Sequence, residues 1–254
     1  MKPRLSLILG LGVLLTPLLL PQPASAQEEQ PASMAAYFYC NQSRAARADT
    51  IVNEYFAPIY DKHVAAGNIT AWGWLSHRIG GKWRRLEYYT APSREALLTA
   101  RAAMIEEFQA DDSGLGQEFN DICPAHDDYI WNFEGGSGDA GIGPRPEWAL
   151  STYFECDFAR EDLADEIYLN VFNGVFDAAV ADGTISGWSW HSHDVGGKYR
   201  RLGVIDGTSV NAVLDGRDAI FEQINEMAEG ALGVFSETCH SHTDYVWNIE
   251  ISRP

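Results

Sequence analysis

The feature of this sequence that most restricts its fold is an internal duplication. Cys40 recurs as Cys156 and Cys123 as Cys239, each 116 positions later, and the surrounding residues recur at the same interval without a gap. Roughly 38 of about 100 aligned pairs are identical, which chance cannot produce. The repeated blocks are Tyr37-Phe38-x-Cys40 with Tyr153-Phe154-x-Cys156, Trp72-x-Trp74-x-Ser76-His77 with Trp188-x-Trp190-x-Ser192-His193, and His126-x-Asp128-Tyr129 with His242-x-Asp244-Tyr245. The duplication predicts two similar structural units in one chain.

The first residues have the pattern of a secretory signal peptide. Lys2 and Arg4 precede an apolar run over residues 5–20, and the small residues Ala24-Ser25-Ala26 follow it. The run is shorter than the roughly 20 apolar residues of a membrane span, which argues against the alternative of an uncleaved anchor. We therefore expect a secreted or periplasmic protein whose signal peptide is removed after Ala26.

The composition of the chain divides it into five segments. The expected segments are a signal peptide over 1–26, an N-terminal tail over 27–34, a first unit over 35–134, a Gly/Pro-rich linker over 135–150 and a second unit over 151–254. As a random coil the linker spans on the order of 20 Å, so the two units can meet face to face.

Hydrophobic periodicity changes in a fixed order within each unit. In the first unit it predicts strands over 35–40, 69–78, 82–90 and 127–134, and helices over 44–66 and after Ser93. The fold class is therefore α+β, with two tandem ferredoxin-like βαββαβ repeats. Each repeat has an antiparallel sheet in the order 4-1-3-2 with both helices on one face.

The other face of each sheet needs a cover. Trp72 and Trp74 alternate with small residues, as do Trp188 and Trp190, and we expect the four indoles to line this free face. Two such sheets packed sheet to sheet as an intramolecular α+β barrel resemble the dimeric α+β barrel superfamily. The resemblance rests on topology and duplication, and it implies no catalytic residue. Members include small-molecule monooxygenases and haem-handling enzymes. The rival arrangement is two separate units that share only an edge.

The four cysteines are expected to form one disulfide in each repeat. In the 4-1-3-2 sheet the end of strand one lies beside the start of strand four, so Cys40 should pair with Cys123 and Cys156 with Cys239. An exported protein can keep such bonds oxidised. We interpret them as structural, because no Cys-x-x-Cys motif is present.

Polar residues are predicted to gather at the disulfide end of the sheets. Strands two, three and four bring His77, Lys82, Arg84, Arg85, His126 and Asp128 to one rim, and the second copy repeats them. One interpretation is a cationic mouth over an aromatic cavity, and the other is a set of structural pairs in which Arg84 or Arg85 binds Asp128 or Glu134. The candidate ligand-binding residues are Trp72, Trp74, His77, Arg84, His126, Trp188, Trp190, His193, Arg200 and His242.

The second copy alone adds two histidines, which give His191-x-His193 and His240-x-His242. Four imidazoles could hold Zn²⁺ or Cu²⁺, so these residues are candidate metal ligands. We predict no other cofactor, and haem is unlikely because no histidine stands out as an axial ligand.

Charge and missing motifs limit the function. A net charge of −18 argues against nucleic acid as a partner, and no membrane contact is expected after signal removal. Dinucleotide, phosphate-loop, His-Glu-x-x-His and Gly-x-Ser-x-Gly motifs are absent. We expect a monomer with an internal pseudo-dimer, acting as a non-catalytic binder of a small apolar or aromatic ligand. The alternative is a small cofactor-free or metal-assisted, monooxygenase-like enzyme on an aromatic compound. The sequence leaves open whether the chain is an enzyme.

Overall fold

The computed structural model describes residues 30–110, 112–138 and 145–254. The predicted signal peptide and the centre of the predicted linker lie outside these residues. We call residues 30–138 the first half and residues 145–254 the second half. None of the helices in these ranges combines the length and hydrophobicity that a membrane span requires.

The first half has the predicted order of elements with one addition. Its elements are β1 (Ala32–Tyr39), α1 (Ala45–Ile51), a π-helical segment (Val52–Phe56), α2 (Ala57–Ala65), β2 (Ala71–Ile79), β3 (Arg85–Ala91), α3 (Arg94–Ala110), α4 (Leu115–Ile122) and β4 (Ala125–Gly138). The predicted first helix is one continuous helical run with a π-helical segment inside it, and α4 is a helix that periodicity did not reveal.

The second half repeats this order. Its elements are β5 (Trp148–Glu155), α5 (Glu161–Ile167), a π-helical segment (Tyr168–Phe172), α6 (Asn173–Ala181), β6 (Gly187–Val195), β7 (Arg201–Gly207), α7 (Val210–Thr238) and β8 (Ser241–Arg253). The long α7 has a kink at Ala228, whose backbone angles are not helical. It covers the positions that α3 and α4 occupy in the first half.

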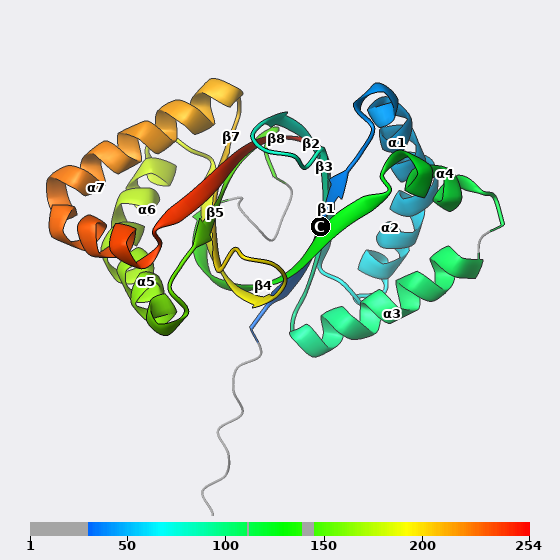
Figure 1. The fold of residues 1–254 in the computed structure, drawn as a ribbon, viewed down its shortest axis with the longest axis horizontal. Coiled ribbons are helices and arrows are strands. Elements are labelled where there is room, and N and C mark those ends of the chain that lie inside the picture. The colour runs from blue at the N-terminus through cyan, green and yellow to red at the C-terminus, as the bar shows by residue number, and fades with distance from the viewer. Residues whose placement is uncertain (1–29, 111, 139–144) are drawn as a thin grey trace, which may run out of the picture.

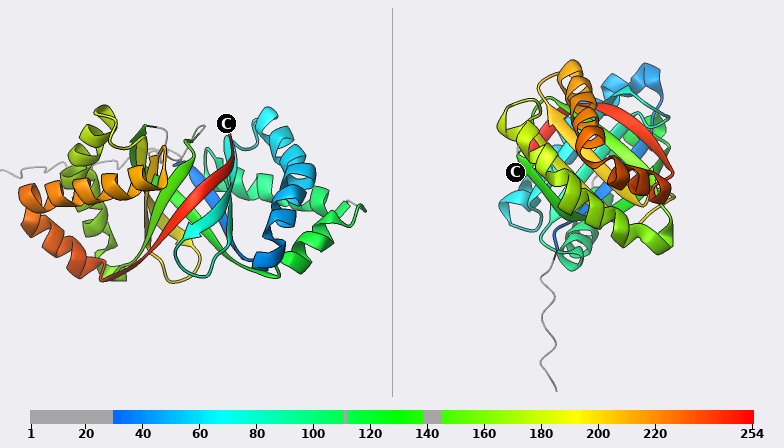
Figure 2. Two further views of the ribbon diagram at one scale, coloured as in Figure 1. Left: turned by 90° about the horizontal axis from the view of Figure 1, so that it is seen from above. Right: turned by 90° about the vertical axis from the view of Figure 1, so that its left-hand side faces the viewer.

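Eight strands close into one barrel in the order β1-β3-β2-β8-β5-β7-β6-β4. Each half contributes the predicted 4-1-3-2 sheet, and the halves join through two antiparallel edges, β2 with β8 and β4 with β6. The barrel lies at the centre, with the helices of the two halves outside it on opposite sides (Figures 1 and 2). The expectation of a closed intramolecular barrel is therefore confirmed, and the rival of separate units is excluded.

Two strands extend beyond the expected bounds of the first unit. The expected N-terminal tail includes Ala32, Ser33 and Met34, which belong to β1. Gly135 to Gly138 of the expected linker continue β4, where they pair with β6. Close backbone contact explains this, because a Cβ at Gly136 would lie 2.4 Å from the Trp188 carbonyl oxygen. These glycines permit strand pairing at the seam.

Both predicted disulfides are present. Cys40 is bonded to Cys123 and Cys156 to Cys239, each across a sequence separation of 83 residues. Each bond joins the residue that follows the first strand of a half to the second residue before its last strand. The pairing inferred from strand order is confirmed.

Candidate functional site

The four candidate tryptophans face the helices and not the interior of the barrel. All four are 2% exposed or less, and each indole N–H donates a hydrogen bond of 2.7–2.8 Å to a helix aspartate. The donors and acceptors are Trp72 with Asp61, Trp74 with Asp49, Trp188 with Asp177, and Trp190 with Asp165. The expectation that these indoles line a cavity between the sheets was therefore wrong.

The narrow interior of the barrel explains the reversal. An eight-stranded barrel has room for little more than its own side chains. Gly73 alternates with the two tryptophans and points inward, where its added Cβ would lie 2.4 Å from the Tyr88 ring. The small residues of the alternation therefore serve the crowded interior, and the indoles fill the wider space under the helices.

At the predicted rim, two arginines bind the histidines that the sequence placed beside them. Arg84 binds the His77 ring over 3.0 Å, and Arg200 binds the His193 ring over 2.7 Å. Burial, followed by the charge of the neighbouring arginine, lowers the pKa of both histidines. These pairs favour the structural interpretation of the rim.

Arg85 is turned toward the helices. It makes a bidentate ion pair with Asp49, with distances of 2.6 and 2.7 Å, and Arg201 binds Asp165 in the same way. The proposed pairing of Arg84 or Arg85 with Asp128 or Glu134 is therefore not the one that forms.

The four candidate metal ligands do not come together. His191 and His193 lie on β6, whereas His242 lies on β8 and His240 precedes it, and these strands are not neighbours. His191 lines the barrel interior, whereas His242 packs against Phe154 on the helix side. No group of three or more potential metal ligands occurs within the described residues. The predicted Zn²⁺ or Cu²⁺ site was wrong, because the two histidine pairs belong to strands that are not neighbours, and His191 and His242 lie on opposite faces of the sheet.

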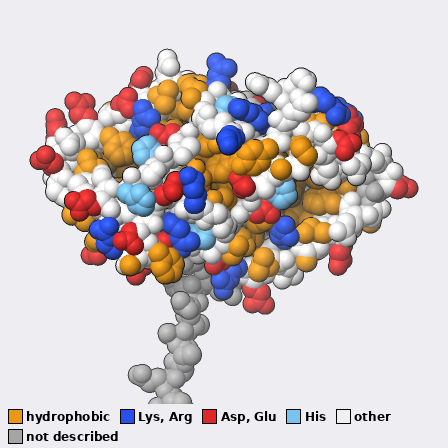
Figure 3. Space-filling model, viewed as in Figure 1, with side chains coloured by type: hydrophobic (Ala, Val, Ile, Leu, Met, Phe, Trp, Pro, Cys, Tyr) orange, Lys and Arg blue, Asp and Glu red, His pale blue; other side chains and the backbone are white. Residues whose placement is uncertain are grey.

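The first half contains a pocket of about 170 Å³ between its sheet and helices. We call it the first-half pocket. Hydrophobic side chains gather in a hollow in this part of the surface, on the right of Figure 3. Six aromatic rings line it, together with Met34, Met104 and the carboxylate Glu87; the rings are Phe38, Phe56, Tyr60, Tyr89, Phe108 and Phe119.

The two halves differ at Glu87, which lines this pocket, and at Val52, which does not line it. Val52 of the first half corresponds to Tyr168, whose ring stacks on Trp190 at 3.9 Å and fills the core of the second half. Glu87 corresponds to Gly203, where an added Cβ would lie 3.2 Å from the Tyr168 hydroxyl. The first half thus has a smaller residue in one position and a carboxylate in the other. Compared with the second half, the first half therefore lacks one tyrosine ring and has one additional carboxylate.

Glu87 is the group with the most distinctive chemistry in this pocket. It retains some exposed surface but is surrounded by protein atoms, and burial raises its pKa to about 7. A hydrogen bond with Tyr60 opposes part of this rise. At neutral pH both protonation states are populated, so Glu87 can accept or donate a hydrogen bond.

Three partly exposed polar residues lie at the opening of the pocket. His126 binds Asp128 over 2.7 Å, and Arg101 lies 3.7 Å from the same carboxylate. The hydrogen bond to Asp128 is the main cause that raises the pKa of His126. His126 is the one sequence candidate that lines this pocket; the other nine ligand candidates do not. Differences between the copies at positions 52 and 87 are the signal that could have identified it.

No protein-family model matches this sequence, and no curated protein matches it. Solved structures match its fold along most of the chain. A "putative monooxygenase" from Lactobacillus acidophilus NCFM has a TM-score of 0.62 at 8% identity, covering 89% of this chain and 96% of its own. An anthrone oxidase-like protein has a TM-score of 0.59 at 13% identity, covering 89% of this chain and 94% of its own. A mutant chlorite dismutase from Candidatus Nitrospira defluvii has a TM-score of 0.53 at 9% identity, covering 88% of this chain and 92% of its own.

These three solved structures match along nearly the whole length of both chains. The chain has their fold. At such low identity the likeness concerns the fold alone, and it transfers no residue role to this protein.

The expectation that haem is unlikely receives no support from the neighbours, which include chlorite dismutases. We therefore ask whether the first-half pocket could hold haem. The first-half pocket has about the volume of the 150 Å³ cavity that accepts one benzene ring, which is far smaller than a porphyrin. Its one histidine, His126, is held by Asp128 at the opening. The pocket in this form does not fit haem, so no step below uses it.

Proposed function

We propose that this protein is an exported binding protein for a small hydroxyaromatic compound, which it holds in the first-half pocket. The observation that carries the proposal is an aromatic-lined space of about 170 Å³ with the partly exposed carboxylate Glu87, whose counterpart Gly203 in the second half lies against the Tyr168 hydroxyl. A ligand from solution would supply to the first half the phenol ring that Tyr168 supplies to the second half.

Size and lining favour a single aromatic ring. Phe56 lies 5.1 Å from Phe108 and 5.0 Å from Phe119, between ring centres, in edge arrangements that leave ring surfaces for a guest. Complete burial of one ring removes on the order of 150 Å² of apolar surface from water, which is worth about 4 kcal/mol before the cost of association.

Glu87 favours a ligand that carries a hydroxyl group. A carboxylate accepts a hydrogen bond from a phenol, and such charge-assisted bonds contribute about 1.5–3 kcal/mol. A purely apolar ring would leave the carboxylate without this contact. The pocket would therefore discriminate phenol from benzene.

Export is part of the proposal. The two disulfides support it, because such bonds persist in oxidising compartments. The signal-peptide pattern of residues 1–26 supports it independently.

A small enzyme acting on an aromatic compound is the second candidate. The observation that favours it is the pKa of Glu87, since a general base is most effective near the operating pH. Glu87 would accept the phenolic proton and leave a phenolate in an apolar pocket. Two neighbours carry monooxygenase or oxidase names, but such chemistry here would need O₂ as co-reactant.

Calorimetric titration of the mature protein with phenol tests the binding proposal. We expect one site, weaker binding of benzene, and about tenfold weaker phenol binding for Glu87→Gln. The matched control is Glu106→Gln, an exposed carboxylate on α3 that does not line the pocket. Equal affinities of all three proteins for phenol would contradict the role of Glu87.

A second variant tests the location. The double substitution V52Y/E87G gives the first half the residue pair that the second half already has, so the variant is expected to fold. It should lose phenol binding because its tyrosine fills the space. Unchanged binding by a folded V52Y/E87G protein would exclude the first-half pocket.

A further inference from the structure

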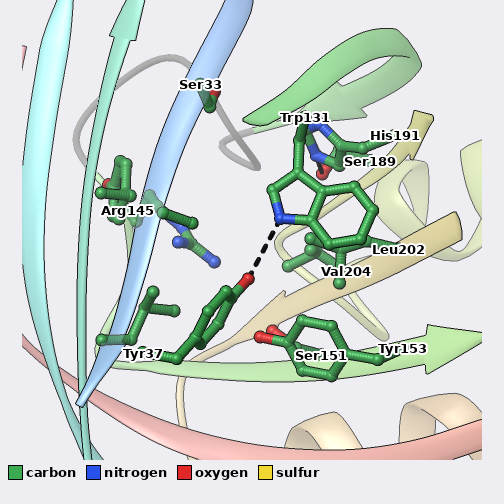
Figure 4. A pocket seen from close by; sticks show the side chains of 13 residues that line it. Ser33, Tyr37, Trp131, Arg145, Ser151, Tyr153, Ser189, His191, Leu202 and Val204 are labelled. Carbon is green, nitrogen blue, oxygen red and sulfur yellow. Dashed lines mark hydrogen bonds between the residues drawn. The ribbon is translucent and has the colours of Figure 1, made fainter. Parts of the chain in front are cut away.

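A second cavity, distinct from the first-half pocket, lies inside the barrel. Its volume is about 60 Å³, which is enough for several water molecules. Figure 4 shows the side chains of Tyr37, Trp131, Arg145, Ser151, Tyr153 and His191 around it. We call it the barrel cavity.

This cavity also results from a difference between the halves. Tyr88 of the first half corresponds to Val204, and Gly73, which faces the Tyr88 ring, corresponds to Ser189. The second half therefore lacks a ring where the first half has one. In addition, His191 replaces Leu75 and Ser151 replaces Ala35, so the space left by the ring is lined by polar groups.

Two buried polar atoms of this lining have no hydrogen-bond partner among the described residues. They are the hydroxyl of Tyr153, which is 0% exposed, and Nδ1 of His191, which is 7% exposed. Tyr37, Ser151 and Trp247 lie near enough to influence the pKa of Tyr153, but none makes a hydrogen bond of good geometry with it. Buried polar atoms without partners are rare, and they indicate a bound group.

A buried ion pair lies at one side of the cavity. Arg145, with 7% of its side chain exposed, donates to both oxygens of the fully buried Asp206 over 2.8 and 2.5 Å. Arg145 lines the cavity and Asp206 does not. The cavity is therefore in contact with the guanidinium, while the carboxylate lies outside its lining.

The lining is rich in hydrogen-bond donors. Burial raises the pKa of Tyr37 and of Tyr153, so both phenols keep their protons at neutral pH. Burial and the charge of Arg145 lower the pKa of His191 to about 3, so its ring is neutral. Nε2 of His191 lies 2.8 Å from the Ser189 hydroxyl, and when Ser189 donates to it, Nδ1 carries the proton. No carboxylate occurs among the described residues that line the cavity.

We propose that the barrel cavity binds a small monovalent anion, of the size of bromide, nitrate or formate, through Arg145, Tyr153 and His191. A guanidinium and neutral O–H and N–H donors, without a lining carboxylate, complement an acceptor with several lone pairs. The small volume favours such ions over larger organic acids. The net charge of −18 repels an anion, but salt screens this repulsion within about 10 Å in solvent. The hydrogen-bond donors of the cavity act at contact distance.

Bromide is the probe for a crystallographic test, since its anomalous signal identifies it among waters. Crystals of the mature protein soaked in sodium bromide should show one peak inside the barrel, within hydrogen-bonding distance of the Tyr153 hydroxyl and of Arg145. Waters alone in the cavity at every bromide concentration would overturn the proposal.

Two variants provide the controls. The double substitution S189G/V204Y gives the second half the Gly-Tyr pair of the first half and should abolish the internal peak. Tyr153→Phe removes one donor and leaves the surrounding packing, so it should fold even if the double variant does not. Bromide should raise the melting temperature of the wild type relative to sodium sulfate at equal ionic strength. Tyr153→Phe should need about ten times more bromide for the same rise. A bromide peak or a melting-temperature rise unchanged in folded variants would refute the assignment.

Discussion

Replacing Glu87 with glutamine should change how the stability of the protein depends on pH. The ordinary pKa of this carboxyl is 4.5, and burial raises it to about 7 in the folded protein. Below pH 4.5 the group is protonated in both the folded and unfolded chains, so it contributes no pH dependence. Between these values the unfolded chain loses the proton first, and the free energy of unfolding therefore falls as pH rises.

The size of the effect follows from the two pKa values. One pKa unit corresponds to 1.36 kcal/mol, so the wild-type protein should lose about 3 kcal/mol between pH 4.5 and pH 8 from this group alone. Glutamine cannot ionise, so Glu87→Gln should lack this loss. Relative to the wild type, the variant should become more stable as pH rises.

Urea denaturation followed by circular dichroism, with both disulfides intact, measures this difference. The free energies of unfolding of the wild type and of Glu87→Gln are compared at pH 4.5, 7 and 8. Glu106→Gln, which changes an exposed carboxylate on the neighbouring helix, is the control. A difference between wild type and Glu87→Gln that does not vary with pH would refute the raised pKa and with it the chemistry assigned to the pocket.

Two further predictions concern the framework around the site. Asp49→Ala should destabilise the protein by about 3–5 kcal/mol in denaturation experiments, because it leaves the buried Arg85 without its ion pair, and a loss below about 1 kcal/mol would show that the pair is not structural. Gly81→Ala should lower the melting temperature, because its added Cβ would lie 2.3 Å from a tyrosine hydroxyl of the other half. Gly174→Ala, in open space on α6, should raise it slightly by helix propensity. Equal melting temperatures of these two glycine variants would contradict the close packing at Gly81.

The strand order, barrel closure and disulfides followed from the sequence because the duplication constrains them strongly. The same element order in both copies determined one sheet topology, and that topology placed Cys40 beside Cys123. These inferences depend on the order of elements along the chain. They do not require knowledge of which face of a strand points inward.

The facing of the tryptophans could not be predicted in the same way. Both faces of each sheet are buried, so the alternation of Trp72 and Trp74 with small residues identifies two faces without saying which is inside. The helix aspartates Asp49 and Asp61 recur at the same interval as the indoles they bind. Their recurrence was a usable signal that the indoles face the helices.

The pocket was missed for a related reason. Attention to identical positions selects residues that both halves need for folding, such as Arg85 and its partner. The first-half pocket is lined by Glu87, which stands where the second half has Gly203 against the Tyr168 hydroxyl, and Val52 stands in place of that tyrosine. In a duplicated chain, a cavity in one copy only is expected at such exchanges of size and charge.

A crystal structure of the mature protein grown with phenol tests the central claim most directly. We predict density for one ring in the first-half pocket, among Phe56, Phe108 and Phe119, with its hydroxyl directed to Glu87, and no ring in the second half. A first-half pocket that stays free of phenol at saturating concentration, or a ring bound only elsewhere, would contradict the account.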